Sequence, residues 1–202
     1  MTQTTNTPQA QKPDPIDWKT YDAGGFKPMP LPGSGYTLKV QKVDFGPNPG
    51  AAPTRNSGGY LQATVDFEVV APGDPYNGYL VRFNRFSTKK WAKRNGNPMG
   101  DLLKGAGSQA QPQTDADYVK ALQAITNQTV TGSLKWEIYS SDHTGADGKA
   151  LNLSSAKNAD QFATDPKTGS MLPYVVVKGA NGKEEKVYAN ARVGFINVKP
   201  VA

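Results

Sequence analysis

Residues 78–100 combine cationic and aromatic side chains without any acidic residue. The stretch reads GYLVRFNRFSTKKWAKRNGNPMG and holds six Lys or Arg residues and four rings. The rest of the chain carries 17 basic and 17 acidic residues, so this stretch accounts for the whole net charge of +6. Clustered cations can replace the counterions along a phosphate chain, and flat rings can stack on bases. The stretch therefore predicts a binding surface for a polyanion, and the alternative is a charged sheet edge that blocks aggregation.

Alternation of side chains along a strand sorts this stretch into two faces. Tyr79, Val81 and Phe83 are expected to face the core, whereas Arg82 and Phe86 are expected on the open face beside Tyr60. The alternative for Phe86 and Trp91 is packing under the following helix. The predicted nucleic-acid-binding residues are Arg55, Tyr60, Arg82, Arg85, Phe86, Lys89, Lys90, Trp91, Lys93 and Arg94.

Catalytic and metal-binding patterns receive little support from the sequence. The chain has no Cys, which excludes disulfides and thiolate metal sites, and its single histidine, His143, lies in a polar segment. The sequence contains neither a GxxxxGK[ST] phosphate loop nor a serine in a nucleophile elbow. We therefore expect a protein that is not an enzyme and that uses no cofactor or metal.

The elements that must position the basic stretch are mostly strands. Residues 36–46, 60–70, 79–86, 128–140 and 191–198 show strand patterns, and LPYVVVKGANGKEEKVYA predicts a hairpin. Two helices are expected between the third and fourth strands. Asn97 and Pro98 suit the start of the first helix, and Thr114 suits the cap of the second.

This order of elements predicts a mainly β fold. We expect a five-stranded barrel of the oligonucleotide-binding (OB) type, with a helical segment between strands 3 and 4 and an extra β-hairpin arm. A β-sandwich with a helical insertion is the alternative. Residues 1–34 are expected to form a flexible tail and residues 35–200 one domain, with a loop and hairpin insertion at about 142–189.

Four blocks of the sequence resemble a known family. GYLVRFNRFSTKK, GNPMGDLLKGAG, NQTVTGSLKWEIYSS and NARVGFINV are similar to successive blocks of a phage-encoded family of small single-stranded DNA-binding proteins, formerly a domain of unknown function. The resemblance covers roughly residues 36–139 and 190–199. It implies an OB-fold barrel, binding of single-stranded DNA with little sequence preference, and a role in phage replication or recombination. The implied site is the block from Arg82 to Arg94.

These observations together predict a non-specific single-stranded DNA-binding protein that protects or presents DNA, and replication or recombination proteins are its expected protein partners. The alternatives are a phage structural or assembly protein and, in third place, a carbohydrate-binding β domain. No apolar run is long enough for a membrane span and the N-terminus lacks the apolar segment of a signal peptide, so we expect no membrane contact and a location in the cytoplasm of the host cell. The oligomeric state is not determined by the sequence.

Overall fold

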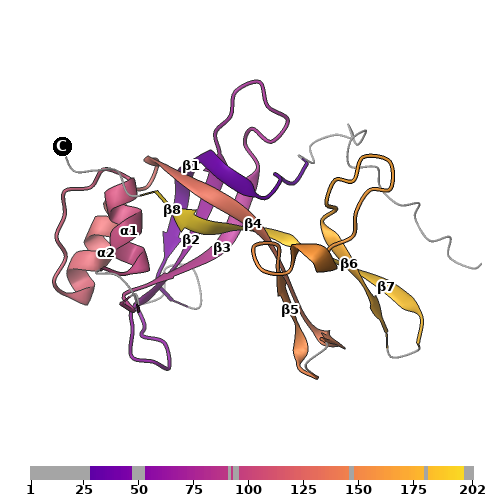
Figure 1. Ribbon diagram of the computed structural model, residues 1–202. Coiled ribbons are helices and arrows are strands. Elements are labelled where there is room, and N and C mark those ends of the chain that lie inside the picture. Colours follow the sequence, from indigo (N-terminus) through magenta and orange to yellow (C-terminus); the bar gives the residue numbers. More distant parts are fainter. Residues whose placement is uncertain are drawn as a thin grey trace, which may run out of the picture.

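The computed structural model describes residues 28–46, 53–90, 92, 96–145, 148–179 and 182–197. They form a mainly β structure with a six-stranded antiparallel sheet, a separate two-stranded sheet and two α-helices (Figure 1). The six-stranded sheet comprises β1 (Gly33–Asp44), β2 (Gln62–Val69), β3 (Leu80–Ser87), β4 (Thr129–Thr144), β5 (Ala150–Ser154) and β8 (Asn190–Ile196). The smaller sheet is the hairpin of β6 (Tyr174–Lys178) and β7 (Glu184–Tyr188), which confirms the hairpin expected from the sequence. A 3₁₀ turn, Ala159–Gln161, lies between the two sheets along the chain.

The long strand β4 organises the six-stranded sheet. The strands lie in the order β3-β2-β1-β4-β5, and β8 pairs with the opposite edge of β4. β1 and β8 flank the first half of β4, whereas β5 pairs with its second half. The sheet curls so that β8 comes close to β3, but no backbone ladder joins these two strands among the described residues. The mainly β class is therefore confirmed, and the closed five-stranded barrel that we expected is not seen.

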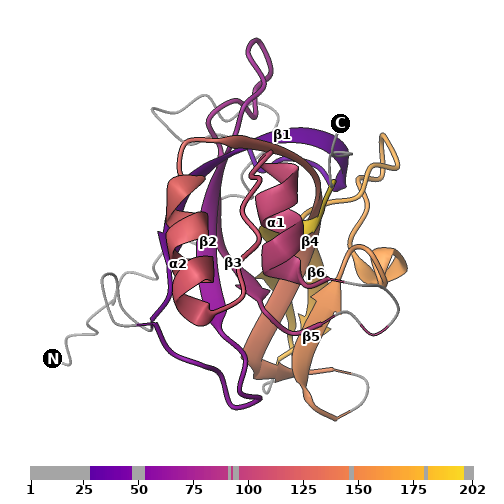
Figure 2. The same ribbon diagram turned by 90° about the vertical axis from the view of Figure 1, so that its left-hand side faces the viewer.

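Two capped helices, α1 (Pro98–Gly105) and α2 (Asp115–Ala124), cover one end of the curled sheet (Figure 2). The side chain of Asn97 accepts a hydrogen bond from the amide of Gly100, and Pro98 occupies the first helical position, as the sequence predicts. In α2, Thr114 and Asp117 form a reciprocal capping box. These caps fix where each helix begins and therefore which face it turns toward the sheet.

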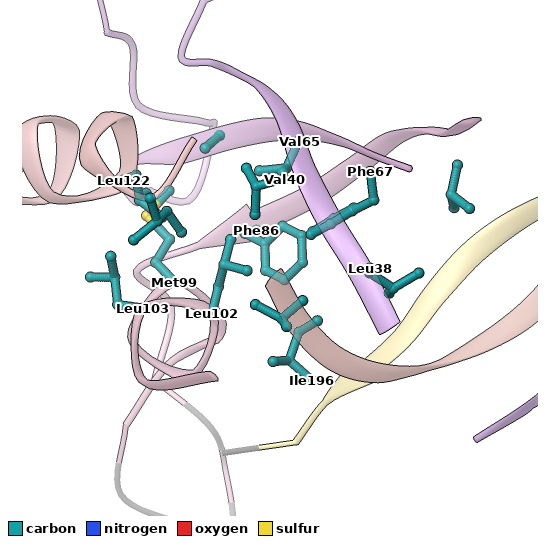
Figure 3. Packing of buried hydrophobic residues seen from close by; sticks show 14 of the residues in the cluster. Leu38, Val40, Val65, Phe67, Phe86, Met99, Leu102, Leu103, Leu122 and Ile196 are labelled. Carbon is teal, nitrogen blue, oxygen red and sulfur yellow. The ribbon is translucent and has the colours of Figure 1, made fainter. Parts of the chain in front are cut away.

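The main core lies between the sheet and the helices. β2 supplies four alternating buried side chains, from Ala63 to Val69, as strict alternation predicts. Figure 3 shows the ring of Phe86 among the side chains of Val65, Phe67 and Leu102. The apolar side chains that alternate along residues 128–140 are also buried as this pattern predicts, namely Val130, Leu134, Trp136 and Ile138, although Ser133 on the expected outer side is buried as well.

A second, smaller core lies where β4 extends beyond the main sheet. It contains Trp136, Ile138, Leu151, Phe162, Val175 and Ala189. The indole Nε1 of Trp136 donates a hydrogen bond to the carbonyl oxygen of Pro30 at 2.9 Å, so the segment before β1 contacts this core. Because Val175 of β6 is buried here, the β6–β7 hairpin packs on the body of the protein at its base.

β4 is longer than the sequence predicts, and β5 was not expected at all. His143 was assigned to a polar surface loop, but it lies within β4 and its side chain is mostly covered. Its Nδ1 lies 2.8 Å from the Ser140 hydroxyl, and its Nε2 lies 3.2 Å from a carboxylate oxygen of Glu185 in β7. His143 therefore links the β4–β5 pair of strands to the β6–β7 hairpin.

No helix in the described ranges is long and apolar enough to cross a membrane.

Candidate nucleic-acid interface

A β-bulge in β3 decides which side chains face outward. Val81 lies opposite Phe67 and Asn84 lies opposite Val65, so the two residues Arg82 and Phe83 share the space opposite Asp66. Phe83 adopts a positive φ of 57°, an uncommon conformation for a residue with a side chain. Its amide donates a hydrogen bond of 2.7 Å to the Asp66 carboxylate. The extra residue reverses the in-and-out alternation from this point onward.

The bulge overturns two predictions about β3. Phe83 was expected in the core but is 63% exposed, and Phe86 was expected on the open face but is 8% exposed. The Phe86 ring packs edge-on against Phe67 with 6.0 Å between the ring centroids. A ring held in this position cannot stack on a ligand, so Phe86 is a core residue and the packing alternative is correct. Arg85, which lies between them, faces outward.

A hollow of about 760 Å³ lies on the outer surface between β3 and β8, and we call it the β3–β8 hollow. Three exposed rings line it: Phe83 from β3, Tyr139 from β4 and Phe195 from β8. Tyr139 is 72% exposed and Phe195 is 52% exposed. Water-facing rings around one concavity are unusual for a folded surface and are typical of a binding site.

The β3–β8 hollow also carries charged groups. Arg85, Lys135 and Arg192 line it together with Asp101 and Glu137. Lys135 is paired with Glu137 at 2.5 Å, and no ion pair involves Arg85 within the described part of the chain. Arg85 therefore offers a free cation beside the rings.

Arg192 in β8 reaches across to β3. Its guanidinium donates a hydrogen bond of 2.7 Å to the carbonyl oxygen of Arg82. It also lies near Tyr79, where burial raises the pKa of the phenol and the positive charge of Arg192 acts in the opposite direction. This contact ties the bulge to β8 and places a second cation in the lining of the hollow.

A second hollow of about 550 Å³, the β2–β3 hollow, lies on the other side of Phe83. Its polar lining includes Arg55, Asn56, Gln62 and Thr64, and it shares Phe83 and Arg85 with the first hollow. None of its lining residues in the described part of the chain is Asp or Glu.

The remaining predicted site residues lie in several places. Arg55 is held by Asp115 of α2, with 2.8 Å between Nε and the carboxylate, and it also donates to the carbonyl of Gly59. Tyr60 is half-buried, with the ammonium group of Lys89 at 6.0 Å from its ring centroid. Lys89, Lys90 and Arg82 are exposed. The predicted residues Trp91, Lys93 and Arg94 lie outside the described residues.

Sequence reasoning missed three residues of the interface. Phe195 and Arg192 come from the last strand, and no pattern in the sequence indicates that this strand lies beside β3. The alternation of β4 did place Tyr139 on the outer face, but that signal did not distinguish it from other outward side chains. Its importance comes from its position on the same hollow as Phe83 and Phe195.

No group of three or more His, Asp or Glu side chains able to hold a metal ion occurs among the residues that the structure describes. Hydrogen bonds from Thr114 hold the pKa of the Asp117 carboxylate below its ordinary value. This residue belongs to the cap of α2 and not to either hollow.

The chain was compared with protein-family models, with curated proteins and with solved structures, and none of the three comparisons finds a match. The resemblance drawn from the sequence blocks therefore stays a prediction.

Proposed function

We propose that the protein binds single-stranded DNA, with little sequence preference, on the outer face of the sheet between β3 and β8. The observation that supports this most directly is the gathering of Phe83, Tyr139 and Phe195 around one hollow beside the unpaired cation of Arg85. Bases of a single strand expose their faces and can stack on such rings, whereas a duplex keeps its bases stacked on each other. Stacking contributes roughly 1–3 kcal/mol per base and depends little on base identity.

The strand arrangement supports an OB-type architecture for this function. In this proposal β1, β2, β3, β8 and β4 correspond to the five strands of a partly open barrel, with α1 and α2 in the connection between the third strand and β4. The proximity of β3 to β8 is the feature that favours this assignment over a flat sheet. A partly open barrel does not require a continuous backbone ladder between β3 and β8.

The proposed biological role follows from the sequence resemblance. A non-specific single-strand binder would protect or present DNA during phage replication or recombination in the cytoplasm of the host, without enzymatic activity of its own. Replication or recombination proteins would be its protein partners.

Binding is tested by fluorescence anisotropy with a labelled thymidine oligomer, an RNA oligomer and a duplex of the same length, each at two salt concentrations. We expect the single strand to bind more tightly than the duplex. The logarithm of its affinity should fall with the logarithm of salt by about 0.7 per phosphate neutralised. Equal affinity for single and double strands would contradict the proposal and favour a structural or assembly protein.

Variants of the rings test whether the β3–β8 hollow is the site. Tyr139→Ala and Phe195→Ala should each weaken binding of the single strand by about tenfold, the equivalent of one stacked base. Tyr188→Ala is the matched control, because Tyr188 is also a half-exposed ring but lies on β7. If the three variants bind alike, the hollow is not the site.

A further inference from the structure

The two hollows meet at Phe83 and Arg85, which line both of them. We propose that one nucleic-acid strand occupies both hollows in succession and crosses β3 at the ring of Phe83. This inference rests on the proposed function, because it specifies the path of the same ligand. It also extends the site to a part of the surface that Tyr139 and Phe195 do not line.

The chemistry of the two hollows is complementary for a single strand. The β3–β8 hollow offers three exposed rings, but its cations are accompanied by Asp101 and Glu137. The β2–β3 hollow offers the unpaired cation of Arg85 and neutral polar groups, together with Arg55, which is paired with Asp115 of α2, and none of its described lining residues is an acid. Bases are therefore best held in the first hollow, and the phosphates that follow them are best held in the second.

The register of the sheet makes the path continuous. Thr64 of β2 lies directly opposite Arg85 of β3, and both face the outer surface. Thr64 lines the β2–β3 hollow and Arg85 lines both hollows. A nucleic acid that leaves Phe83 therefore meets Arg85 and then Thr64, and it crosses no other β-strand between them. A ligand confined to one hollow would leave this adjoining surface unused.

Three hydrogen bonds hold the bulge, and with it Phe83, at the crossing point. Asp66 accepts the hydrogen bond of the Phe83 amide, and Arg192 donates to the carbonyl of Arg82. Asn84 donates to the carbonyl of Val81 at 2.8 Å. A backbone conformation of this kind is costly and persists when its surroundings fix it, which is common at binding sites. Asp66 is thus a positioning residue for the ring.

The length dependence of binding tests the path. Thymidine oligomers of about 4 to about 16 nucleotides cover the range of site sizes found for OB folds. Thr64→Glu places a negative charge in the β2–β3 hollow, and Thr37→Glu is the matched control because it makes the same substitution on an exposed position of β1 outside both hollows. Gln62→Glu is a second variant of the same hollow for the case in which Thr64→Glu is poorly folded.

We expect Thr64→Glu to weaken the longest oligomer by about tenfold, comparable to one lost charge-assisted contact, while the shortest oligomer binds almost as tightly as it does to the parent. Thr37→Glu should leave both affinities nearly unchanged. If Thr64→Glu weakens short and long oligomers by the same factor, or acts no more strongly than Thr37→Glu, the strand does not continue into the second hollow. If no oligomer binds the parent protein, the proposed function itself fails.

Photocrosslinking provides a second test that involves no substitution. The shortest thymidine oligomer that binds with full affinity, which is too short to occupy the site in several registers, carries one 5-bromouracil. Its position is moved along the oligomer in separate samples, and the crosslinked peptides are identified by mass spectrometry. As the bromouracil moves, crosslinks should shift in order from Phe195 or Tyr139 to Phe83 and then to the peptides around Thr64. Crosslinks to both hollows from every position would show that the two hollows bind strands independently, which overturns the proposal.

Discussion

The side-chain oxygen of Asn84 in β3 accepts a hydrogen bond of 2.8 Å from the backbone amide of Val193 in β8. The amide nitrogen of the same side chain donates to the carbonyls of Val65 and Val81. One buried side chain therefore takes the place of a backbone ladder between β3 and β8 and also fixes the bulge. The shape of the β3–β8 hollow depends on it.

Asn84→Ala should lower the free energy of unfolding by about 1–3 kcal/mol, because the backbone groups of Val65, Val81 and Val193 lose the hydrogen bonds that the buried Asn84 side chain makes to them. Chemical denaturation measures this change. Asn190→Ala is the matched control, since Asn190 lies in β8 but is exposed. A loss of stability no larger than that of the control would show that the contact between β3 and β8 is not maintained by Asn84.

Phe86→Ala and Phe83→Ala should change different properties of the protein, the first its stability and the second its binding of single strands. Removal of the buried Phe86 ring should destabilise the fold by about 3–5 kcal/mol, as for other large core residues. Removal of the exposed Phe83 ring should leave the midpoint of denaturation nearly unchanged and weaken single-strand binding by roughly 1–3 kcal/mol. Denaturation and anisotropy on the two variants check this. The bulge assignment is wrong if Phe83→Ala is the more destabilising change.

Arg85→Gln should reduce the steepness of the salt dependence of single-strand binding. The expected change is about 0.7 in the log-log slope if Arg85 contacts one phosphate. Lys120→Gln removes the same charge from an exposed position on α2 and should leave the slope unaltered. Equal slopes for the parent and Arg85→Gln would remove this cation from the interface.

The capping box of α2 should make the stability of the folded protein depend on pH in the acid range. Hydrogen bonds from Thr114 lower the pKa of Asp117 in the folded protein, so the carboxylate contributes stability above its unfolded pKa of 3.8, and this contribution is lost as the pH falls through the lower folded value. Thr114→Ala should therefore lower the melting temperature at neutral pH by more than it does in strong acid. Thermal denaturation followed by circular dichroism at both pH values checks the sign. A pH-independent difference would mean that Asp117 is not held by Thr114 in solution.

Local patterns predicted most of the secondary structure. Alternation identified β2 and the buried side of β4, and the residues Asn97, Pro98 and Thr114 marked the starts of both helices. These features depend on neighbours in the sequence, namely the period of a strand and the capping of free amides, so they can be found without knowledge of the fold. The sequence also singled out the described cations of the basic stretch, Arg82, Arg85, Lys89 and Lys90, and all four are exposed.

Tertiary structure alone decided which rings face outward and where the last strand lies. Whether Phe83 or Phe86 enters the core depends on one extra residue opposite Asp66, and a bulge leaves no reliable mark in the alternation of a single strand. The approach of β8 to β3 brings Phe195 and Arg192 to Phe83 from more than a hundred residues away. That approach is set by the curl of the sheet and by the Asn84 side chain, because the strands share no ladder whose register the sequence could reveal.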